Sequence, residues 1–194
     1  MTMIPRPYIM TARAAAAADT KARIIASAAA LLSANTFAGM TLEAIAADAG
    51  TTVRTVLRIF SSKETLFASA LESFGDRGFG PVHPGDVEAT LDTLYDFYEK
   101  FGDVVIRWLA DEPHVPSLRD HLKTGRRHLR EWVGESFAPI LTSLEGAARK
   151  QMLDALIVAL DVYTWKLTRR DFGLKRKAAQ AVACRIVVAL TERG

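Results

Sequence analysis

Two short apolar stripes flank Gly50, and this stretch constrains the fold of the chain more than any other. Before the glycine, apolar residues recur at the i, i+3, i+4, i+7 spacing of one helical face, behind a threonine that can cap the helix. The same spacing recurs after it, where Thr51 or Thr52 can act as the cap. Glycine readily adopts the turn conformation between two helices, so the stretch predicts a helix-turn-helix. The pattern consists of Thr41, Leu42, Ile45, Ala46 and Ala49, then Val53, Val56, Leu57 and Phe60.

The face opposite the second stripe is basic. It carries Arg54, Thr55 and Arg58, and no acidic residue occurs between Ala49 and Lys63. Side chains four residues apart lie side by side on a helix, so the two arginines form one cationic surface. Such a surface favours binding to a polyanion.

A third helix is expected directly after this segment. Ser61 and Glu64 have the S-x-x-E spacing of a capping box, which puts Lys63 in the first helical turn. A cation at a helix N-terminus opposes the helix dipole unless an anion binds there. Lys63 is therefore a candidate phosphate contact, together with the backbone N–H groups of that turn.

The stretch 41–66, about an eighth of the chain, resembles the DNA-binding domain of the tetracycline-repressor (TetR) family. The usual pattern of that family is roughly T-x-x-x-I-A-x-x-A-G-V-S-x-x-T-L-Y-x-H-F-x-S-K-E-x-L. The matching positions here are Thr41, Ile45, Ala46, Ala49, Gly50, Thr52, Thr55, Phe60, Ser62, Lys63, Glu64 and Leu66.

Two departures from the family pattern matter most. Leu57 replaces a tyrosine, and Ile59 replaces a histidine or tyrosine, both of which usually touch DNA phosphates in the family. The resemblance therefore implies that two backbone contacts are missing. We expect Leu57 to join the core, and Ile59 to lie toward the outer face, where it could contact a thymine methyl group or a sugar.

The resemblance implies a homodimeric transcriptional regulator, expected to be a repressor, whose two helix-turn-helix units bind a near-palindromic operator. Arg54 and Thr55 are expected to contact base edges, and Arg58 base or phosphate. Thr41, Thr52 and Lys63 are expected to position the DNA backbone. Two alternatives stay open: an activator with the same domain, and a helical dimer that binds a small molecule or partner protein with weakened DNA binding.

We expect an all-α fold with a flexible tail at residues 1–18, a DNA-binding domain at 19–65 and a helical effector-binding and dimerisation domain at 66–194. The first helix is expected to begin in the alanine run or at Asp19, with Met10 as an alternative start. No apolar run reaches the roughly 18 residues that a membrane span needs. The single cysteine, Cys184, excludes an internal disulfide and fits a cytoplasmic location.

The remaining helices are expected at residues 86–110, 117–144, 147–168 and 175–192, with Asp86 capping the first and Pro139 kinking the second. The last two segments are apolar on more than one face, which indicates a second surface to bury. The family resemblance implies that they form a four-helix dimer interface with a second copy.

Aromatic residues are frequent in the segments that enclose a ligand cavity in this family. Each is individually more typical of a core, but together they indicate an apolar effector site with few polar anchors, for which Arg126 is a further candidate. His114, His121 and His128 recur every seven residues, a spacing that does not favour metal binding. We expect no cofactor, no metal and no enzymatic activity, because no catalytic motif is found. The expected ligand-binding residues are Phe101, Trp108, His128, Trp132 and Tyr163.

Overall fold

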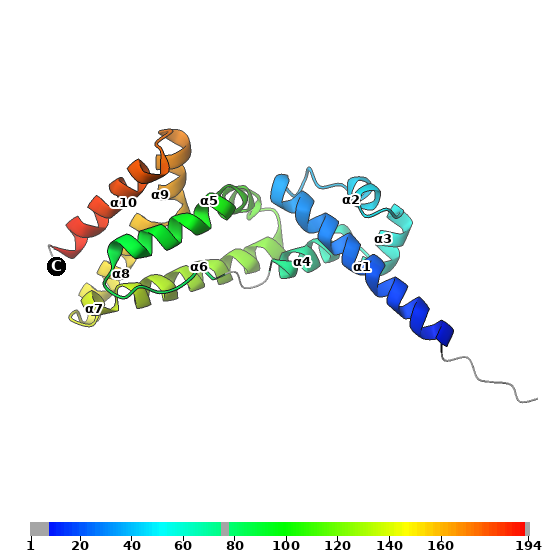
Figure 1. The fold of residues 1–194 in the computed structure, drawn as a ribbon, viewed down its shortest axis with the longest axis horizontal. Helices are drawn as coiled ribbons and strands as arrows, with labels where there is room; N and C mark the ends of the chain where they lie inside the picture. The colour runs from blue at the N-terminus through cyan, green and yellow to red at the C-terminus, as the bar shows by residue number, and fades with distance from the viewer. Residues whose placement is uncertain (1–7, 75–77, 193–194) are drawn as a thin grey trace, which may run out of the picture. The chain divides into compact units, whose positions relative to one another are not determined.

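The structure of the protein is a computed structural model that describes residues 8–74 and 78–192 (Figure 1). Within these ranges the regular structure is entirely helical, which confirms the expected all-α class. The chain divides into two compact units. The N-terminal unit comprises residues 1–76 with 115–118, and the C-terminal unit comprises residues 77–114 with 119–194. Across the described ranges, no helix combines the length and apolarity needed to cross a membrane.

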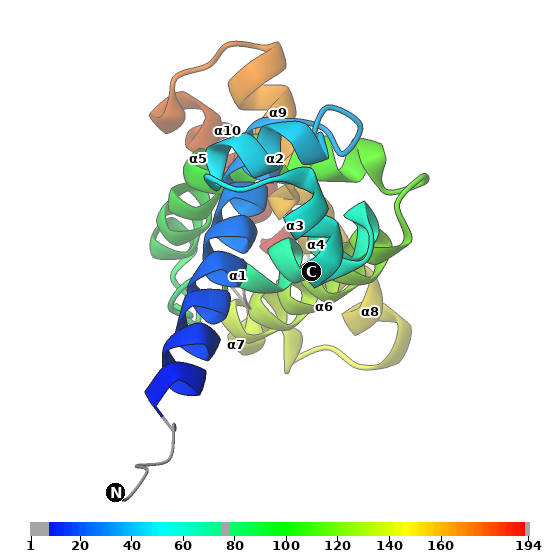
Figure 2. The same cartoon turned by 90° about the vertical axis from the view of Figure 1, so that its right-hand side faces the viewer.

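Four helices form the N-terminal unit: α1 (Tyr8–Ala34), α2 (Leu42–Asp48), α3 (Val53–Phe60) and α4 (Lys63–Ser73). The long helix α1 runs beside the three shorter ones and packs most extensively along α4 (Figures 1 and 2). Each helix contributes apolar side chains to a common core, as the periodicity predicts. The buried residues include Ile24, Ala28, Leu32, Ile45, Val56, Phe60, Leu66 and Phe67.

The predicted helix boundaries around the turn are confirmed. The Thr41 hydroxyl accepts a hydrogen bond from the backbone N–H of Ala44 at 3.1 Å, and the Thr52 hydroxyl accepts one from Thr55 at 3.2 Å. Gly50 lies between the two helices with a φ of +62°. Only glycine adopts this left-handed conformation without strain from a Cβ atom.

The predicted Ser61–Glu64 capping box is wrong by one residue. Ser62 is the N-cap of α4, and its hydroxyl accepts from the N–H of Thr65 at 3.1 Å. Ser61 instead ends α3 with a φ of +65°, so its backbone is committed to the turn. Hydrogen bonding to its own backbone N–H and to Ser62 holds the pKa of Glu64 below its ordinary value.

Two expected boundaries also differ in the structure. Helix α1 begins at Tyr8, so residues 8–18 are helical where a flexible tail was expected, since alanine is the strongest helix former. The expectation for residues 1–7 lies outside the described residues. The N-terminal unit runs to residue 76 rather than 65, because α4 contributes Leu66, Phe67 and Ala70 to the buried core and packs along α1.

The C-terminal unit is built from α5 (Val87–Asp111), most of α6 (Pro116–Ser136), α7 (Ala138–Leu141), α8 (Gly146–Leu160), α9 (Val162–Lys166), the π-helix η1 (Leu167–Asp171) and α10 (Arg176–Thr191). Asp86 caps α5 as predicted, with its carboxylate accepting from Ala89 N–H at 2.9 Å. Helix α5 packs against both α9 and α10. The core of the unit includes Leu94, Tyr98, Trp132, Val133, Phe137, Leu156, Trp165 and Val187.

Two helices that the sequence pattern predicted as continuous are interrupted. Helix α6 ends at Ser136, and the short α7 follows with Pro139 in its first turn. Helix α8 ends at Leu160, because Asp161 has an extended backbone and its carboxylate caps α9 through the N–H of Tyr163 at 2.9 Å. Burial raises the pKa of Asp161. The expected single helix 147–168 is therefore three shorter segments.

The π-helix η1 is bound to α5 by charged side chains. The Arg169 guanidinium donates to both carboxylate oxygens of Glu99, at 2.6 and 2.8 Å, and Trp165 Nε1 donates to the same carboxylate at 3.2 Å. Arg170 makes a second two-point contact with Asp103, at 2.9 Å on each oxygen. These contacts hold the pKa of both carboxyl groups below their ordinary values.

Candidate nucleic-acid interface

Helix α3 presents a basic face while its opposite face is buried. Val56 and Phe60 are 0 % and 3 % exposed, so the core determines how the helix is rotated. Arg54 and Arg58 are exposed on the other side, as the spacing predicted. The guanidinium groups are therefore available to a polyanion.

The hydroxyls of Thr52 and Thr55 are ordered at the N-terminal end of α3. Their oxygens lie 3.1 Å apart, and Thr52 also caps the helix. Each hydroxyl carries one proton and two lone pairs, so one of the two protons is left over after this mutual hydrogen bond. Thr41 keeps its hydroxyl proton in the same way, because the Thr41 oxygen acts as the acceptor for Ala44. Thr41 and one of the Thr52–Thr55 pair can therefore donate a hydroxyl proton to a phosphate or a base, and the other member of the pair can still accept a hydrogen bond.

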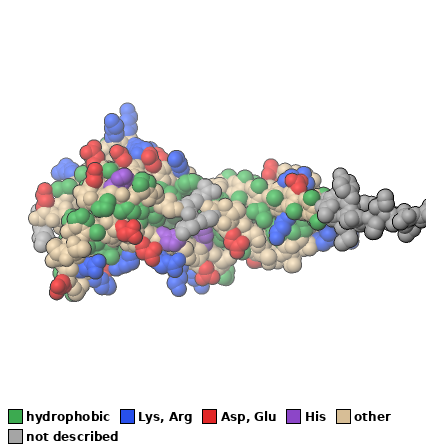
Figure 3. Space-filling view, turned by 60° about the horizontal axis from the view of Figure 1, so that its bottom comes forward, with side chains coloured by type: hydrophobic (Ala, Val, Ile, Leu, Met, Phe, Trp, Pro, Cys, Tyr) green, Lys and Arg blue, Asp and Glu red, His purple; other side chains and the backbone are tan. Residues whose placement is uncertain are grey.

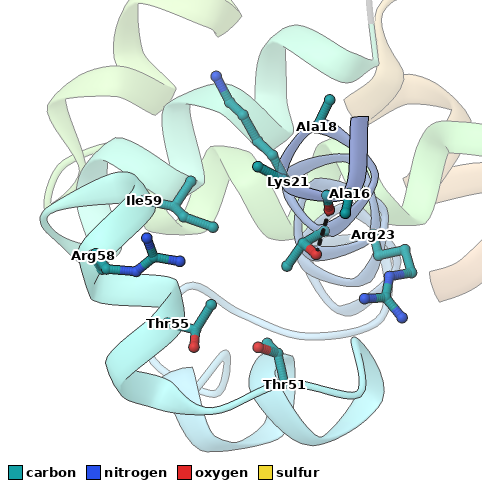
Figure 4. Close-up of a pocket in the computed structure, with 10 residues that line it drawn as sticks. Ala16, Ala18, Lys21, Arg23, Thr51, Thr55, Arg58 and Ile59 are labelled. Carbon is teal, nitrogen blue, oxygen red and sulfur yellow. Dashed lines mark hydrogen bonds between the residues drawn. The ribbon is translucent and has the colours of Figure 1, made fainter. Parts of the chain in front are cut away.

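Leu57 and Ile59 are placed the opposite way from the sequence-based expectation. Leu57 is 40 % exposed and does not join the core. Ile59 is half-buried and faces α1, where it lines a groove with Ala16 and Lys21 (Figure 4). The apolar side chain that a DNA base could meet is thus Leu57, on the exposed side of α3.

Lys63 is engaged within its own unit. Its ammonium nitrogen donates to the backbone carbonyl of Phe37 at 2.7 Å and lies 4.3 Å from the centre of the Phe37 ring. The ring in turn packs edge-on against Phe67 at 4.6 Å. Lys63 is at the first position of α4, as predicted, but it also anchors the α1–α2 connection. The 26 residues between the partners explain why no local pattern predicted this contact.

An open groove lies between the first half of α1 and the flank of α3, with a volume of about 560 Å³. Figure 4 shows Arg58 reaching from α3 toward α1, with the Thr51 and Thr55 hydroxyls at one end of the groove. No local sequence pattern marks Lys21, Arg23 and Thr51 as parts of one site, because only the tertiary packing brings these residues together beside α3. The alanine run was visible in the sequence, but its position opposite α3 was not.

The five expected ligand-binding residues occupy different environments in the C-terminal unit. Trp108 and Trp132 are buried. The Trp108 ring packs edge-on against the His121 ring, with 5.3 Å between the ring centres. The indole N–H of Trp132 donates a hydrogen bond to the Gly80 carbonyl at 3.1 Å. Burial lowers the pKa of His121. Phe101 and His128 are half-buried, and Tyr163 is 56 % exposed.

Tyr163 therefore lies at the surface rather than in the wall of an enclosed site. Arg126, the other candidate anchor, binds both carboxylate oxygens of Glu112, at 3.1 and 2.5 Å. This ion pair raises the pKa of Arg126 and lowers that of Glu112. Within the described ranges, His, Cys, Asp and Glu side chains do not gather into a group of three or more.

Comparison with known proteins identifies the helix-turn-helix. Residues 24–70, which include α2, α3 and most of α4, match the family model for bacterial regulatory proteins of the tetR family. The helix-turn-helix of this chain is thus similar to that of the tetR family of bacterial regulatory proteins. The match spans the half of α1 that carries the core residues, and it ends inside α4.

A longer similarity is found with the HTH-type transcriptional repressor SCO4008 of Streptomyces coelicolor, which is 31% identical over 112 residues. The match covers 53% of this chain and spans 58% of the length of that relative, a little over half. Two solved structures share the fold at 15% identity. A transcriptional regulator from Rhodococcus sp. Rha1 has a TM-score of 0.67 over 89% of this chain and 96% of its own. A structure from Pseudomonas aeruginosa PAO1 has a TM-score of 0.63 over 89% and 90%.

Proposed function

We propose that this protein is a sequence-specific DNA-binding transcriptional regulator that acts as a repressor. The observation that carries the proposal is the exposed Arg54–Arg58 face of α3, held outward by the burial of Val56 and Phe60. The TetR-family match of the same unit and the similarity to a transcriptional repressor support it.

The residues divide by the part of DNA that their chemistry suits. Arg54 can bind a guanine edge through two hydrogen bonds, and the Thr55 hydroxyl can bond a neighbouring base. Thr41 and Thr52 can donate their hydroxyl protons to phosphates, which positions the helix without reading sequence. Lys63 has two ammonium protons besides the one donated to Phe37, so it can support a phosphate while it holds the α1–α2 connection.

The C-terminal unit offers a surface for homodimerisation. Val158 on α8 is 69 % exposed, and Val182 and Ile186 on α10 are also exposed. Figure 3 shows hydrophobic side chains spread over this unit among charged ones. An exposed apolar surface of this kind is typical of a protein interface. Pairing of α8 and α10 with those of a second copy would present two α3 helices to a near-palindromic operator in the cytoplasm.

Effector control is the second part of the proposal. A small, largely apolar molecule that binds the C-terminal unit would release the operator only if it binds one conformation of the dimer more tightly than the other. The candidate apolar contacts are the half-buried Phe101 and the buried Trp108 and Trp132, which a ligand would reach only in a conformation that opens a cavity beside them. His128 and Tyr163 are the candidate polar contacts. A ligand that binds tightly without changing operator affinity would contradict this role.

Operator selection followed by salt titration tests the DNA-binding function. Random duplexes are enriched on the purified protein, and affinity is then measured by fluorescence anisotropy for the selected and the scrambled sequence at several salt concentrations. A regulator should select an inverted repeat and lose affinity steeply with added salt, because phosphate contacts release counterions. No measurable DNA binding at low salt would favour the alternative, a helical dimer that binds a small molecule or partner protein.

A further inference from the structure

The groove between α1 and α3 is cationic on both walls. Arg58 enters it from α3, while Lys21 and Arg23 border it on α1 (Figure 4). The described residues that line it include no Asp or Glu. Asp19 lies one turn before Arg23 and pairs with it at 3.4 Å, both side chains being largely exposed. Lys21 and Arg58 are therefore the two groove cations for which no carboxylate partner is found among the described residues.

The shape of the groove suits an extended anion. The α1 wall is formed around Ala17 by small side chains, and the opposite wall by Thr51 and Ile59. Methyl groups allow a bound chain to approach close to the helix, whereas longer side chains would hold it away. The groove is partly open to solvent. A sugar-phosphate strand has the charge and the extended form that these walls accommodate.

The groove is also continuous with the surface that reads DNA in the proposed function. Thr55 and Arg58 belong to both, because they lie on the side of α3 that turns from its exposed face toward α1. Successive residues on a helix are separated by about 100°, so Leu57 lies on the other side of the arginine face from Ile59. A DNA strand in the groove would run beside the bases contacted by Arg54.

We propose that the α1–α3 groove binds the sugar-phosphate backbone of one operator strand, with Lys21 and Arg58 contacting phosphates from opposite walls. The proposal rests on the proposed function and deepens it. It assigns Arg58 to phosphate rather than to a base, and it adds Lys21 and the Thr51 hydroxyl to the interface. Leu57 stands where the TetR family has a phosphate-binding tyrosine. The groove, on the opposite side of α3, would supply contacts to the DNA backbone in place of that tyrosine.

The first test measures the salt dependence of binding. Lys21→Ala and Arg58→Ala should each reduce the slope of log affinity against log salt by about 0.9 per half-site, or about 1.8 for the dimer. Each should weaken selected and scrambled duplexes by the same factor, because phosphate contacts carry no sequence information. Lys100→Ala, which removes an exposed cation on α5, is the control and should leave the slope unchanged.

The second test fills the groove. Ala17→Glu places a carboxylate on its wall and should weaken binding to both duplexes by more than about tenfold. Ala15→Glu makes the same substitution two residues away, at an exposed position of α1 outside the groove lining, and should weaken binding by less than about threefold. Thermal melts of both variants should match the wild type, because glutamate is a good helix former at exposed positions.

A neutral methylphosphonate placed at single positions of the selected operator identifies the phosphate concerned. One substitution per half-site should weaken the wild type and have no further effect on Lys21→Ala. Unchanged slopes in Lys21→Ala and Arg58→Ala, with Arg54→Ala still losing specificity, would overturn the groove assignment and leave the regulator function intact. Absence of DNA binding by the wild type at low salt would overturn both.

Discussion

At the scale of single residues, function depends on which side of α3 each side chain takes. Arg54 is exposed on the face opposite Val56, and no described residue of its unit is found to bind the guanidinium in the way that the Phe37 carbonyl binds Lys63. Arg54→Ala should therefore cost roughly 1–3 kcal/mol of binding free energy on the selected operator and relax the sequence preference. Anisotropy titrations with selected and scrambled duplexes measure both effects. Equal losses on the two duplexes would reject base contact by Arg54.

Leu57 offers a gain-of-function test at the same scale. Because Leu57 is 40 % exposed, a tyrosine at this position can point outward without disturbing the core. Leu57→Tyr should restore a hydroxyl-to-phosphate hydrogen bond and raise DNA affinity by about two- to tenfold. Leu57→Phe carries the same ring without the hydroxyl and should give no such gain. A similar gain from both variants would show that ring packing, rather than a phosphate contact, is responsible.

At the scale of secondary-structure elements, ionic contacts join η1 to α5. The side chains of Glu99 and Arg169 are only 25% and 18% exposed. Their two-point contact holds η1 against α5, and no side-chain cap stabilises the N-terminus of this π-helix. Exposed ion pairs contribute little to stability, but a partly buried pair with two charged hydrogen bonds contributes more. Glu99→Gln should therefore lower the free energy of unfolding at pH 7 by roughly 1–3 kcal/mol.

The same pair predicts a pH dependence. Arg169 holds the pKa of Glu99 below its ordinary value. The carboxylate therefore stabilises the fold fully at pH values above the pKa that Glu99 has in the unfolded chain, about 4.3. This contribution is lost as the pH falls through the folded pKa of Glu99. Thermal melts between about pH 3 and pH 8 should show the difference between wild type and Glu99→Gln shrinking below about pH 4. Glu131→Gln, in an exposed pair 3.9 Å from Arg127, should show little difference at any pH. A constant difference for Glu99→Gln would contradict the assignment.

At the scale of the whole molecule, the proposed function requires two DNA-binding units to act together on a palindromic operator. Val182→Asp places a charge on the exposed apolar face of α10 and should shift the protein to a monomer, because a charge in an apolar interface is costly to desolvate. Light scattering coupled to size-exclusion chromatography measures this. Operator affinity should fall as the contribution of the second half-site is lost.

Lys123→Asp is the matched control for that substitution, since Lys123 is exposed on α6 and does not belong to the apolar face. It should leave the mass of the particle unchanged. A wild-type protein that is monomeric at all concentrations would reject dimerisation through α8 and α10. A Val182→Asp variant that stays dimeric would contradict pairing through α10. The interface would then be sought at other exposed apolar residues, such as Tyr163 on α9 and Phe172 just after η1.

The sequence by itself determined the local features of the DNA-binding unit. The cap at Thr41, the left-handed Gly50 and the outward Arg54–Arg58 face are as predicted, and Thr52 is the cap of the two candidates, Thr51 and Thr52. Each depends on residues within about one helical turn, so periodicity and capping chemistry are sufficient to predict it. The all-α class follows from the same repeated patterns along the chain.

Only the tertiary structure decided which residues of other helices these segments contact. Leu57 and Ile59 both border the apolar stripe of α3, and the position of α1 determines that Ile59 is covered while Leu57 is exposed. The contact of Lys63 with Phe37 and the groove beside Lys21 likewise join segments far apart in the sequence. Such contacts depend on how helices pack, and the periodicity of one helix specifies its buried face but not its neighbour.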